Sequence, residues 1–346
     1  MRTNRMHHAG LPSFYKVESM VLLIGSGTMA VEYAKVLDAQ AKKLIVVGRG
    51  KDSASEFEKK TGHSVMTGGV DLAIENGRIK NISTAIVCVG VESLQEVTIK
   101  LIQQGVKKIL VEKPGVLNLG QIKPLIELAS KNQSEVYIAY NRRFLSSVKK
   151  AMKIIAEDGG IRSFTFDFTE WGHEIENLKK PQVVKENWVL ANSSHVLDLA
   201  FYLGGMPEKL NADHSGAVAW HKTAAIFVGS GKTDKGSLFS YHANWGAPGR
   251  WGLEFCTDNH KLILRPMEKL HVMKKNTIKI DEVEVEEEDR ILDEKFKPGL
   301  YRMVEEFFLK KSQELCSLEQ LQINMNYFGK IGNYHNKQIS LDVKRN

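Results

Sequence analysis

The sequence predicts two domains: a doubly wound α/β domain with a parallel sheet, followed by an α+β domain with an open, mostly antiparallel sheet. Three observations carry this prediction. The chain has 346 residues, more than one ordinary core holds. Between Met20 and about Tyr140, short apolar runs alternate with helical patterns. After Arg143 the pattern changes to alternating polar and apolar residues, which is typical of half-buried antiparallel strands.

Five apolar runs predict the strands of the parallel sheet in the first domain. The stretch between the first two runs places Met29, Tyr33 and Val36 on one helical face, which predicts an amphipathic helix. Residues 94–104 predict another helix before the fourth strand. The predicted strands are residues 21–24, 44–47, 84–89, 108–111 and 136–140.

Phe164, Phe166 and Phe168 alternate with polar residues, and this period of two predicts the first strand of the second sheet. The glycines from Gly229 to Gly236 predict a turn between two later strands. We expect the acidic run 282–289 to be a solvated strand edge rather than an interaction tail. The other predicted strands are 224–228, 237–245, 253–256, 261–264, 270–273 and 277–280, and the predicted helices are 148–156, 193–203, 299–311 and 318–331.

Composition excludes several classes of protein. With 42% hydrophobic and 26% charged residues, the chain is typical of a soluble globular protein. Its net charge of +7 comes from basic residues interleaved with acidic ones, so we expect no nucleic-acid partner. No apolar run is long enough to cross a membrane, and residues 1–19 lack the apolar stretch of a signal peptide, which predicts a cytoplasmic protein. Three widely spaced cysteines predict reduced, packing thiols and no metal site.

Residues 25–30 have the sequence GSGTMA, directly after the first predicted strand and at the start of a predicted helix. Gly25 permits a tight turn, Gly27 permits backbone approach to a pyrophosphate, and Ala30 permits close packing of the helix on the strand. The helix N-terminus then attracts the anion. This GxGxxA pattern predicts a dinucleotide site with contacts from Gly25, Ser26, Gly27, Thr28 and Met29.

The second predicted strand ends in the sequence GRGKDS at residues 48–53, without the acid that usually binds the ribose hydroxyls of NAD. Arg49 can instead pair with the 2′-phosphate of NADP, supported by Lys51 or Ser53. NADP is therefore the preferred cofactor. NAD is the alternative, in which Arg49 stacks on the adenine or faces solvent.

Further motifs follow in a fixed order. Glu112, Lys113 and Pro114 end the fourth predicted strand, the sequence AYNRRF ends the fifth, and a predicted helix carries His195 and Asp198. Together with the glycine motif, this order resembles the Gfo/Idh/MocA oxidoreductases, named for glucose–fructose oxidoreductase and inositol dehydrogenase. The resemblance covers residues 20–264.

The resemblance implies an N-terminal extension at 1–19, a Rossmann domain at 20–144, and a substrate-binding and oligomerisation domain at 145–346. The helix at 318–331 can pack back on the Rossmann domain. Lys113 would be the catalytic lysine, because its ammonium group can stabilise the alkoxide at the sheet edge where ligands bind. Glu112 would hold that lysine or the cofactor, and Pro114 would fix the turn through a cis bond.

The resemblance also implies that His195 takes part in proton transfer or binds sugar hydroxyls; otherwise it is a satisfied core histidine. Relatives commonly have an acid four residues before this histidine, but here Ala191 occupies that position. The neighbouring Asn192 can hydrogen-bond to substrate but cannot accept a proton. Asp198 either faces the site or ties its helix to the sheet.

Relatives usually have a proline and a histidine after the third predicted strand, and this chain has neither. The backbone of Val89 and Gly90 is still expected to line the nicotinamide ribose. Asn141 and Arg142 correspond to residues near the substrate, where Arg142 or Arg143 can pair with a phosphate or carboxylate or support the domain junction.

A loop with the sequence WGAPGRW at residues 245–251 brings aromatic and cationic groups together. Its tryptophans can stack on a sugar ring or base while Arg250 meets an acidic group. Alternatively, the loop packs on a neighbouring subunit. Further candidates for the edge of the pocket are Trp171, His173, Lys185 and Trp188.

These motifs predict an NAD(P)-dependent oxidoreductase that transfers hydride between nicotinamide and a hydroxyl or keto carbon of a sugar or sugar derivative. A phosphate, nucleotide or carboxylate on the substrate would suit the basic charge balance. The alternatives are a polyol or dihydrodiol dehydrogenase and a non-catalytic dinucleotide-binding regulator of the same fold. The expected partners are a small sugar-like molecule and further copies of the chain, in a homodimer or homotetramer formed through the C-terminal sheet.

Overall fold

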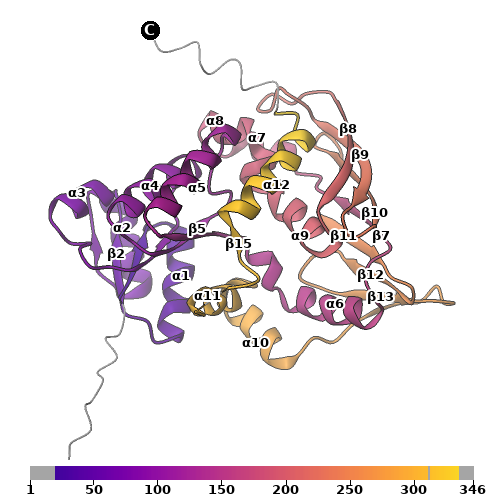
Figure 1. The fold of residues 1–346 in the computed structure, drawn as a ribbon, viewed down its shortest axis with the longest axis horizontal. Helices are drawn as coiled ribbons and strands as arrows, with labels where there is room; N and C mark the ends of the chain where they lie inside the picture. The colour runs from indigo at the N-terminus through magenta and orange to yellow at the C-terminus, as the bar shows by residue number, and fades with distance from the viewer. Residues whose placement is uncertain (1–19, 311, 335–346) are drawn as a thin grey trace, which may run out of the picture.

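The computed structural model describes residues 20–310 and 312–334 (Figure 1). The predicted N-terminal extension and the last residue of the predicted helix 299–311 lie outside these described residues. Two sheets form the framework, one on each side of the molecule in Figure 1, and helices lie against both. This arrangement confirms the predicted pairing of a doubly wound domain with an α+β domain.

The first sheet has the strand order β15-β6-β5-β4-β1-β2-β3, and β1 to β6 all run parallel. Its central strands are buried along their whole length, which explains why the sequence shows them as continuous apolar runs. All five predicted strands are present; β3 has two residues and gave no sequence signal. The bounds are β1 (Val21–Ile24), β2 (Leu44–Val47), β3 (Val65–Met66), β4 (Thr84–Val87), β5 (Lys108–Glu112) and β6 (Glu135–Ala139).

Helices connect these strands on both faces of the sheet. In α1, Ala30, Tyr33, Val36 and Leu37 are buried and make up the apolar face that the sequence predicts. The 3-10 turn η1 (Val91–Ser93) precedes α4, and η2 (Leu119–Gln121) precedes α5. The helices are α1 (Thr28–Ala39), α2 (Lys51–Thr61), α3 (Gly69–Glu75), α4 (Leu94–Gln103) and α5 (Ile122–Lys131).

The second sheet has the order β14-β13-β12-β11-β7-β10-β9-β8, in which only the β7–β10 pair is parallel. Phe164, Phe166 and Phe168 are buried on its inner face. β14 starts three residues later than predicted, and β8 was not predicted. The strands are β7 (Ser163–Asp167), β8 (Pro207–Ser215), β9 (Ile226–Thr233), β10 (Leu238–Asn244), β11 (Gly252–Cys256), β12 (His260–Leu264), β13 (His271–Lys274) and β14 (Ile280–Glu282).

The prediction of a turn from Gly229 onwards is wrong, because Gly229 and Gly231 lie inside β9. A Cβ at Gly231 would come within 2.0 Å of the Lys209 carbonyl oxygen and 2.6 Å of the Phe239 ring. These glycines therefore permit close backbone and aromatic approach, and the turn itself follows β9 and includes Gly236.

Helices cover the inner face of the second sheet and the junction between the domains. The chain passes from β6 through η3 (Asn141–Phe144) into α6 (Ser146–Glu157), and a π-helix, η4 (Val189–Ser193), leads into α9. The other helices of this half are α7 (Gly172–Asn177), α8 (Gln182–Glu186), α9 (Ser194–Gly204), α10 (Glu287–Lys295), α11 (Leu300–Phe308) and α12 (Leu318–Ile331). None of the described helices has the length and apolar character needed to cross a membrane.

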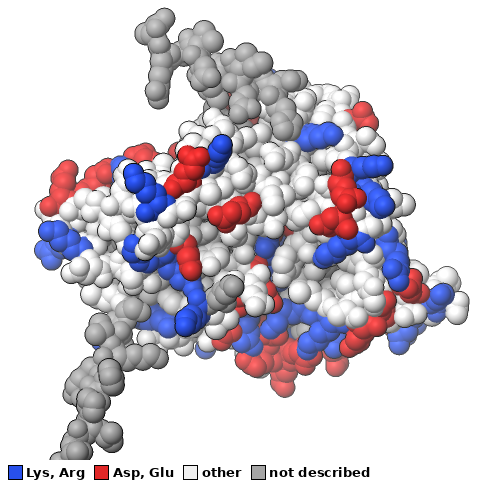
Figure 2. Space-filling model, viewed as in Figure 1, with Lys and Arg blue, Asp and Glu red and all other residues white. Residues whose placement is uncertain are grey.

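The expectation that the acidic run 282–289 forms a strand edge is wrong for most of its length. Only Glu282 belongs to the edge strand β14, and Glu287 begins α10. Acidic residues in the first turn of a helix interact favourably with its dipole. Figure 2 shows basic and acidic side chains interleaved on this face of the molecule, with acidic groups gathered along the lower edge.

The C-terminal segment returns to the first domain. β15 (Cys316–Ser317) pairs antiparallel with β6, and α11 lies against α1. α12 contacts α5 and β6 of the first domain and β8 and α9 of the second (Figure 1). The two sheets thereby share one continuous buried core, to which α12 contributes Leu321, Met325 and Phe328.

Candidate active site

The glycine motif forms the turn between β1 and α1, as predicted. Gly25 has φ of +126°, and a Cβ there would lie 2.6 Å from the Cys88 carbonyl oxygen, so only glycine fits. A Cβ on Gly27 would meet no atom within 4 Å, which leaves the backbone open to a ligand. A cavity of about 420 Å³ adjoins the turn, and its lining includes the predicted cofactor residues Gly25, Ser26, Gly27, Arg49, Val89 and Gly90.

This cavity fits the adenine nucleotide part of a dinucleotide, because open glycine backbone and the N-terminus of α1 border it. Thr28 and Met29, the other predicted contacts, form the first turn of α1 and do not line the cavity. Arg49 is exposed and has no acidic partner among the described residues. Ser53 also lines the cavity, and its hydroxyl lies 2.9 Å from that of Ser26.

Lys113 lies at the carboxyl end of β5, where the Lys113–Pro114 peptide bond is cis as predicted. Its Nζ donates a hydrogen bond to the carbonyl oxygen of Ala191, 2.5 Å away across the domain junction. Burial lowers the pKa of Lys113 to about 8; Glu112 and Glu170 oppose this effect. Lys113 is therefore mostly protonated at neutral pH and can still exchange its proton.

Glu112 accepts a hydrogen bond from the Tyr33 hydroxyl at 2.8 Å, which ties the end of β5 to α1. Burial raises the pKa of Glu112, against the hydrogen bond from Tyr33 and the charge of Lys113. The carboxylate thus acts on Lys113 through its charge, while its hydrogen bond fixes the framework beneath the site.

His195 lies in α9 between the rings of Tyr140 and Trp251, with ring centroids 6.2 and 6.1 Å away. Burial lowers the pKa of His195 well below its usual value, and Lys113 and other nearby cations lower it further. Its Nδ1 is buried and has no hydrogen-bond partner among the described residues. The ring is therefore neutral at neutral pH and can bind a hydroxyl group or accept a proton.

Asn192 and Ala191 belong to the π-helix η4, and Asn192 donates a hydrogen bond to Glu170 at 2.9 Å. Sequence reasoning missed Glu170, a carboxylate that is only 2% exposed and lies just beyond the end of β7. The sequence did contain a signal that could have identified Glu170: it is an acidic residue shortly after a half-buried strand and next to Trp171. Short π-helical turns occur frequently at functional sites.

Two cationic side chains stack with tryptophans at the edge of this site. Arg250 lies over Trp171 and Trp251, 4.8 and 5.2 Å from the ring centroids, and Arg142 lies over Trp251 at 5.6 Å. Arg142 also pairs with Glu268 at 2.5 Å. Trp171 and Arg250 are both about half exposed, so this stack can meet a ligand from solvent.

The neighbouring predicted residues support the framework. Arg143 and Asp198 form a buried bidentate ion pair at 2.7 and 2.5 Å, so of the two arginines Arg143 ties the junction together. The Asn141 amide, predicted to contact substrate, donates to the Pro298 carbonyl oxygen at 2.8 Å. Lys185 donates to a backbone carbonyl of α7, while His173 is exposed.

Lys297 is a second residue that sequence reasoning missed. It lies just before α11, and its charge helps to lower the pKa values of Lys113 and His195. Nothing in its local sequence marks it, because the C-terminal segment brings it to the site only in the folded chain. The described residues contain no group of His, Cys, Asp and Glu that could hold a metal ion.

A second cavity, of about 390 Å³, lies between the domains. It is lined by Val91 and Glu92 after β4, by the loop from Val116 to Leu119 that follows the cis proline, and by Leu190 of η4. This second cavity therefore extends from the first domain to η4, the π-helix that accepts a hydrogen bond from Lys113.

Residues 20–140 match the model of an oxidoreductase family with an NAD-binding Rossmann fold, GFO_IDH_MocA. No curated protein matches the chain. Among solved structures, UDP-N-acetylglucosamine 3-dehydrogenase GnnA from Acidithiobacillus ferrooxidans is 15% identical, with a TM-score of 0.70 over 91% of this chain and 97% of that one. An NAD-binding oxidoreductase from Klebsiella pneumoniae is 16% identical, with a TM-score of 0.72 over 92% and 97%.

Levoglucosan dehydrogenase, solved in complex with NADH, is 17% identical, with a TM-score of 0.71 over 92% of this chain and 97% of that one. At such identities the structures show a shared fold across both domains. The family model adds the match of the nucleotide-binding domain itself. Residues 20–140 are thus similar to the nucleotide-binding domain of the Gfo/Idh/MocA oxidoreductases, and the solved structures show that the fold of both domains is shared.

Proposed function

We propose that the protein is an NADP-preferring oxidoreductase that acts on a hydroxyl or keto carbon of a sugar or sugar derivative. The observation that carries this proposal is the position of Lys113: it lies at the carboxyl end of β5 and donates a hydrogen bond across the domain junction to Ala191, near enough to the buried, neutral His195 to lower its pKa. Two similar structures, named as a UDP-N-acetylglucosamine dehydrogenase and a levoglucosan dehydrogenase, support a sugar-like substrate.

The residues around the first cavity fit the cofactor. Gly25 and Gly27 leave room for a pyrophosphate, and the exposed guanidinium of Arg49 can pair with a 2′-phosphate. The bound nicotinamide would supply or accept the hydride. An adenine-ribose without the 2′-phosphate would leave Arg49 without an ionic partner, which is the reason for preferring NADP.

The residues of the second half supply the proton chemistry and the charge. In the reductive direction, the Lys113 ammonium group can stabilise and protonate the oxygen of a carbonyl, and His195 can bind a neighbouring hydroxyl. Arg142, Arg250 and Lys297 add positive charge near these groups. A substrate with a phosphate, nucleotide or carboxylate group would be attracted to them.

The first test is a titration of purified protein with NADPH and NADH, followed by nicotinamide fluorescence. We expect NADPH to bind more tightly than NADH, and Arg49→Ala to weaken NADPH binding about tenfold or more while leaving NADH binding unchanged. Lys59→Ala, on the exposed last turn of α2, is the matched control. Equal or tighter binding of NADH by the wild type would overturn the NADP preference, and binding of neither would overturn the oxidoreductase function.

A screen of keto-sugars by oxidation of NADPH then tests turnover. Lys113→Ala should retain NADPH binding and lose activity by about a hundredfold or more, because the proton donor is gone. A protein that binds NADPH but turns over no keto-sugar, polyol or dihydrodiol would favour a non-catalytic regulator.

We further propose that the protein works in the cytoplasm as a homodimer or homotetramer formed through the outer face of the second sheet. Three free cysteines support a reducing compartment, and the exposed apolar side chains of Val228 and Leu238 on β9 and β10 support a sheet interface. Light scattering of wild type and Leu238→Glu tests the assembly; a wild-type monomer would contradict it.

A further inference from the structure

Glu170 is a buried carboxylate at the candidate active site that the sequence analysis did not single out. Its side chain is 2% exposed. One oxygen, Oε1, accepts hydrogen bonds from Asn192 Nδ2 at 2.9 Å and from Ser193 Oγ at 2.8 Å. The other, Oε2, lies 3.9 Å from Arg250 Nη1. Buried charges are costly unless they are paired, so a function has to account for this one.

The π-helix η4 is held from two sides at consecutive residues. Lys113, from the first domain, donates to the carbonyl oxygen of Ala191, and Glu170, from the second, accepts from Asn192 and Ser193. The carboxylate and the ammonium group therefore lie around the same short turn. Ala191, which accepts from Lys113, directly precedes the two residues that donate to Glu170.

Four charged groups act on Lys113 from the elements packed around it. Glu112 lies on the same strand, Glu170 follows β7, Arg142 is in η3, and Lys297 precedes α11. Burial and the charge of Lys113 in turn lower the pKa of His195 in α9, which is neutral. Of these two carboxylates, Glu112 accepts a hydrogen bond from Tyr33 in the framework. Glu170 instead accepts from Asn192 and lies near Arg250, two residues proposed to meet the substrate.

We propose that Glu170 keeps the Lys113 ammonium group charged and holds Asn192 and Arg250 in place for the substrate. Glu170 is thus a positioning residue of the site, and the inference rests on the proposed oxidoreductase function.

The role can be measured without a known substrate. Acetic anhydride acetylates only the neutral form of an amine, so the extent of Lys113 acetylation at each pH, read by mass spectrometry, gives its titration midpoint. We expect a midpoint near pH 8 in the wild type. Glu170→Gln removes the negative charge but keeps an oxygen that can accept from Asn192 and Ser193, and should lower the midpoint by roughly one pH unit.

Two controls separate charge from structure. Glu174→Gln removes an exposed carboxylate four residues away in the sequence and should leave the midpoint unchanged. Ser193→Ala removes one hydrogen bond to Glu170 but keeps its charge, and should also leave the midpoint near pH 8. An unchanged midpoint in Glu170→Gln, or an equal shift in Ser193→Ala, would overturn the proposal.

A carboxylate moved to position 191, the residue whose carbonyl oxygen accepts from Lys113, gives the sharpest test. In the double variant Ala191→Asp with Glu170→Gln, the midpoint should return toward that of the wild type. A double variant that retains the low midpoint of Glu170→Gln would contradict the role of a carboxylate charge at this turn. If Glu170→Gln alone does not fold, the double variant decides the question, because it must fold and show the wild-type midpoint.

These outcomes are independent of the proposed function. Failure of the wild type to bind either NADPH or NADH would remove the oxidoreductase function but would not change the Lys113 midpoint. A wild-type midpoint in Glu170→Gln, together with tight NADPH binding, would instead remove only the role of Glu170.

Discussion

Burial, rather than any one neighbour, gives Lys113 its chemistry. Desolvation lowers its pKa from 10.5 to about 8, against the opposing charges of Glu112 and Glu170. With any keto-sugar that the screen identifies, kcat/KM for reduction by NADPH should therefore fall as the pH rises through about 8, because the protonated amine of Lys113 is the proposed acid. Oxidation of the corresponding alcohol should rise over the same range. Steady-state kinetics between pH 6 and 10 measure both profiles.

Lys113→Arg is the control for this pH dependence. A guanidinium stays protonated over the whole range. The variant should therefore lose most of its activity, and its remaining kcat/KM should no longer fall near pH 8. A wild-type reduction profile that is flat through this range would mean that another group donates the proton.

The adjacent residues Arg142 and Arg143 have different roles. The Arg143–Asp198 pair has side-chain exposures of 5% and 1%, whereas Arg142 faces the tryptophan stack. Asp198→Asn would leave the Arg143 guanidinium buried without its counter-charge, so we expect the free energy of unfolding in urea to fall by about 3–5 kcal/mol. Asp258→Asn, which breaks the exposed pair with Arg162, should have little effect on the free energy of unfolding. Equal losses in both variants would contradict this distinction.

Local patterns were enough to predict part of the site. Gly25, Gly27, Lys113 and the cis proline all lie in short motifs next to strands, where the sequence itself defines the backbone setting. Glu170 and Lys297 could not be found in this way. Their importance depends on which segments meet in the folded chain, and one sequence alone carries no record of that.

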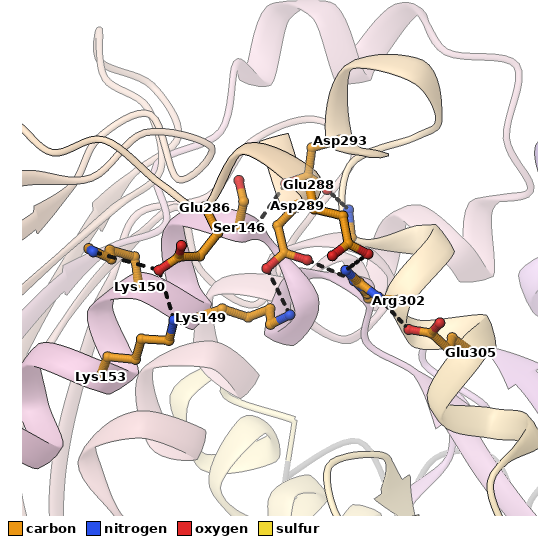
Figure 3. Close-up of polar contacts among 11 residues, drawn as sticks. Ser146, Lys149, Lys150, Lys153, Glu286, Glu288, Asp289, Asp293, Arg302 and Glu305 are labelled. Carbon is orange, nitrogen blue, oxygen red and sulfur yellow. Dashed lines mark hydrogen bonds and ion pairs between the residues drawn. The ribbon is translucent and has the colours of Figure 1, made fainter. Parts of the chain in front are cut away.

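Among the elements, helix α10 shows how an acidic run can be structural. Figure 3 shows Asp289 between Lys149 of α6 and Arg302 of α11, with hydrogen bonds of 2.8 and 2.7 Å. Glu286 pairs with Lys153 at 2.8 Å on the same side. The run therefore joins α10 to two other helices through ion pairs.

The Asp289 carboxylate should stabilise this group of helices in a pH-dependent way. Burial raises the pKa of Asp289, but hydrogen bonds from Lys149 and Arg302 outweigh burial and lower it below its usual value. Its contribution is thus fully present above the unfolded pKa of about 4 and is lost as the pH falls through the lower folded value. Asp289→Asn should cost roughly 1–2 kcal/mol of unfolding free energy at pH 7.

Urea unfolding of wild type and Asp289→Asn at pH 7 and at acid pH measures this contribution. The difference between the two proteins should shrink as the pH falls below about 4. Glu294→Gln, in the exposed pair with Arg290, should have little effect at either pH. A difference that grows in acid would show that the Asp289 pKa is raised rather than lowered.

Elements with a regular pattern of apolar residues could be predicted from the sequence. Elements whose residues are chosen for close packing of backbone and side chains could not. α12 has the bounds the sequence predicts, because its apolar face is regular over its whole length. Gly229 and Gly231 suggested a turn, since glycine marks turns and tight strand packing alike. β8 was missed because most of its residues are exposed, which leaves little apolar alternation to read.

At the scale of the whole molecule, the chain does not divide into two independent units. α11 buries Leu300, Met303, Val304 and Phe307 in a cluster with α1, and β15 extends the first sheet from the C-terminal side. α12 contributes to a core that includes residues of both sheets. Such shared burial couples the unfolding of the two halves, because neither can lose its packing without exposing the other.

The tryptophans allow this coupling to be tested. All five, from Trp171 to Trp251, lie in the second domain, whereas the proposed NADPH cavity is lined by residues of the first. NADPH at a hundred times its Kd should raise the free energy of the tryptophan-reported urea transition by about 2.7 kcal/mol if the molecule unfolds as one unit. NADH at the same concentration should give a smaller shift, in proportion to its weaker binding. An unchanged free energy of the tryptophan-reported transition in the presence of NADPH would contradict this coupling. It would mean that α11, β15 and α12 do not couple the two domains energetically and that the second domain unfolds on its own.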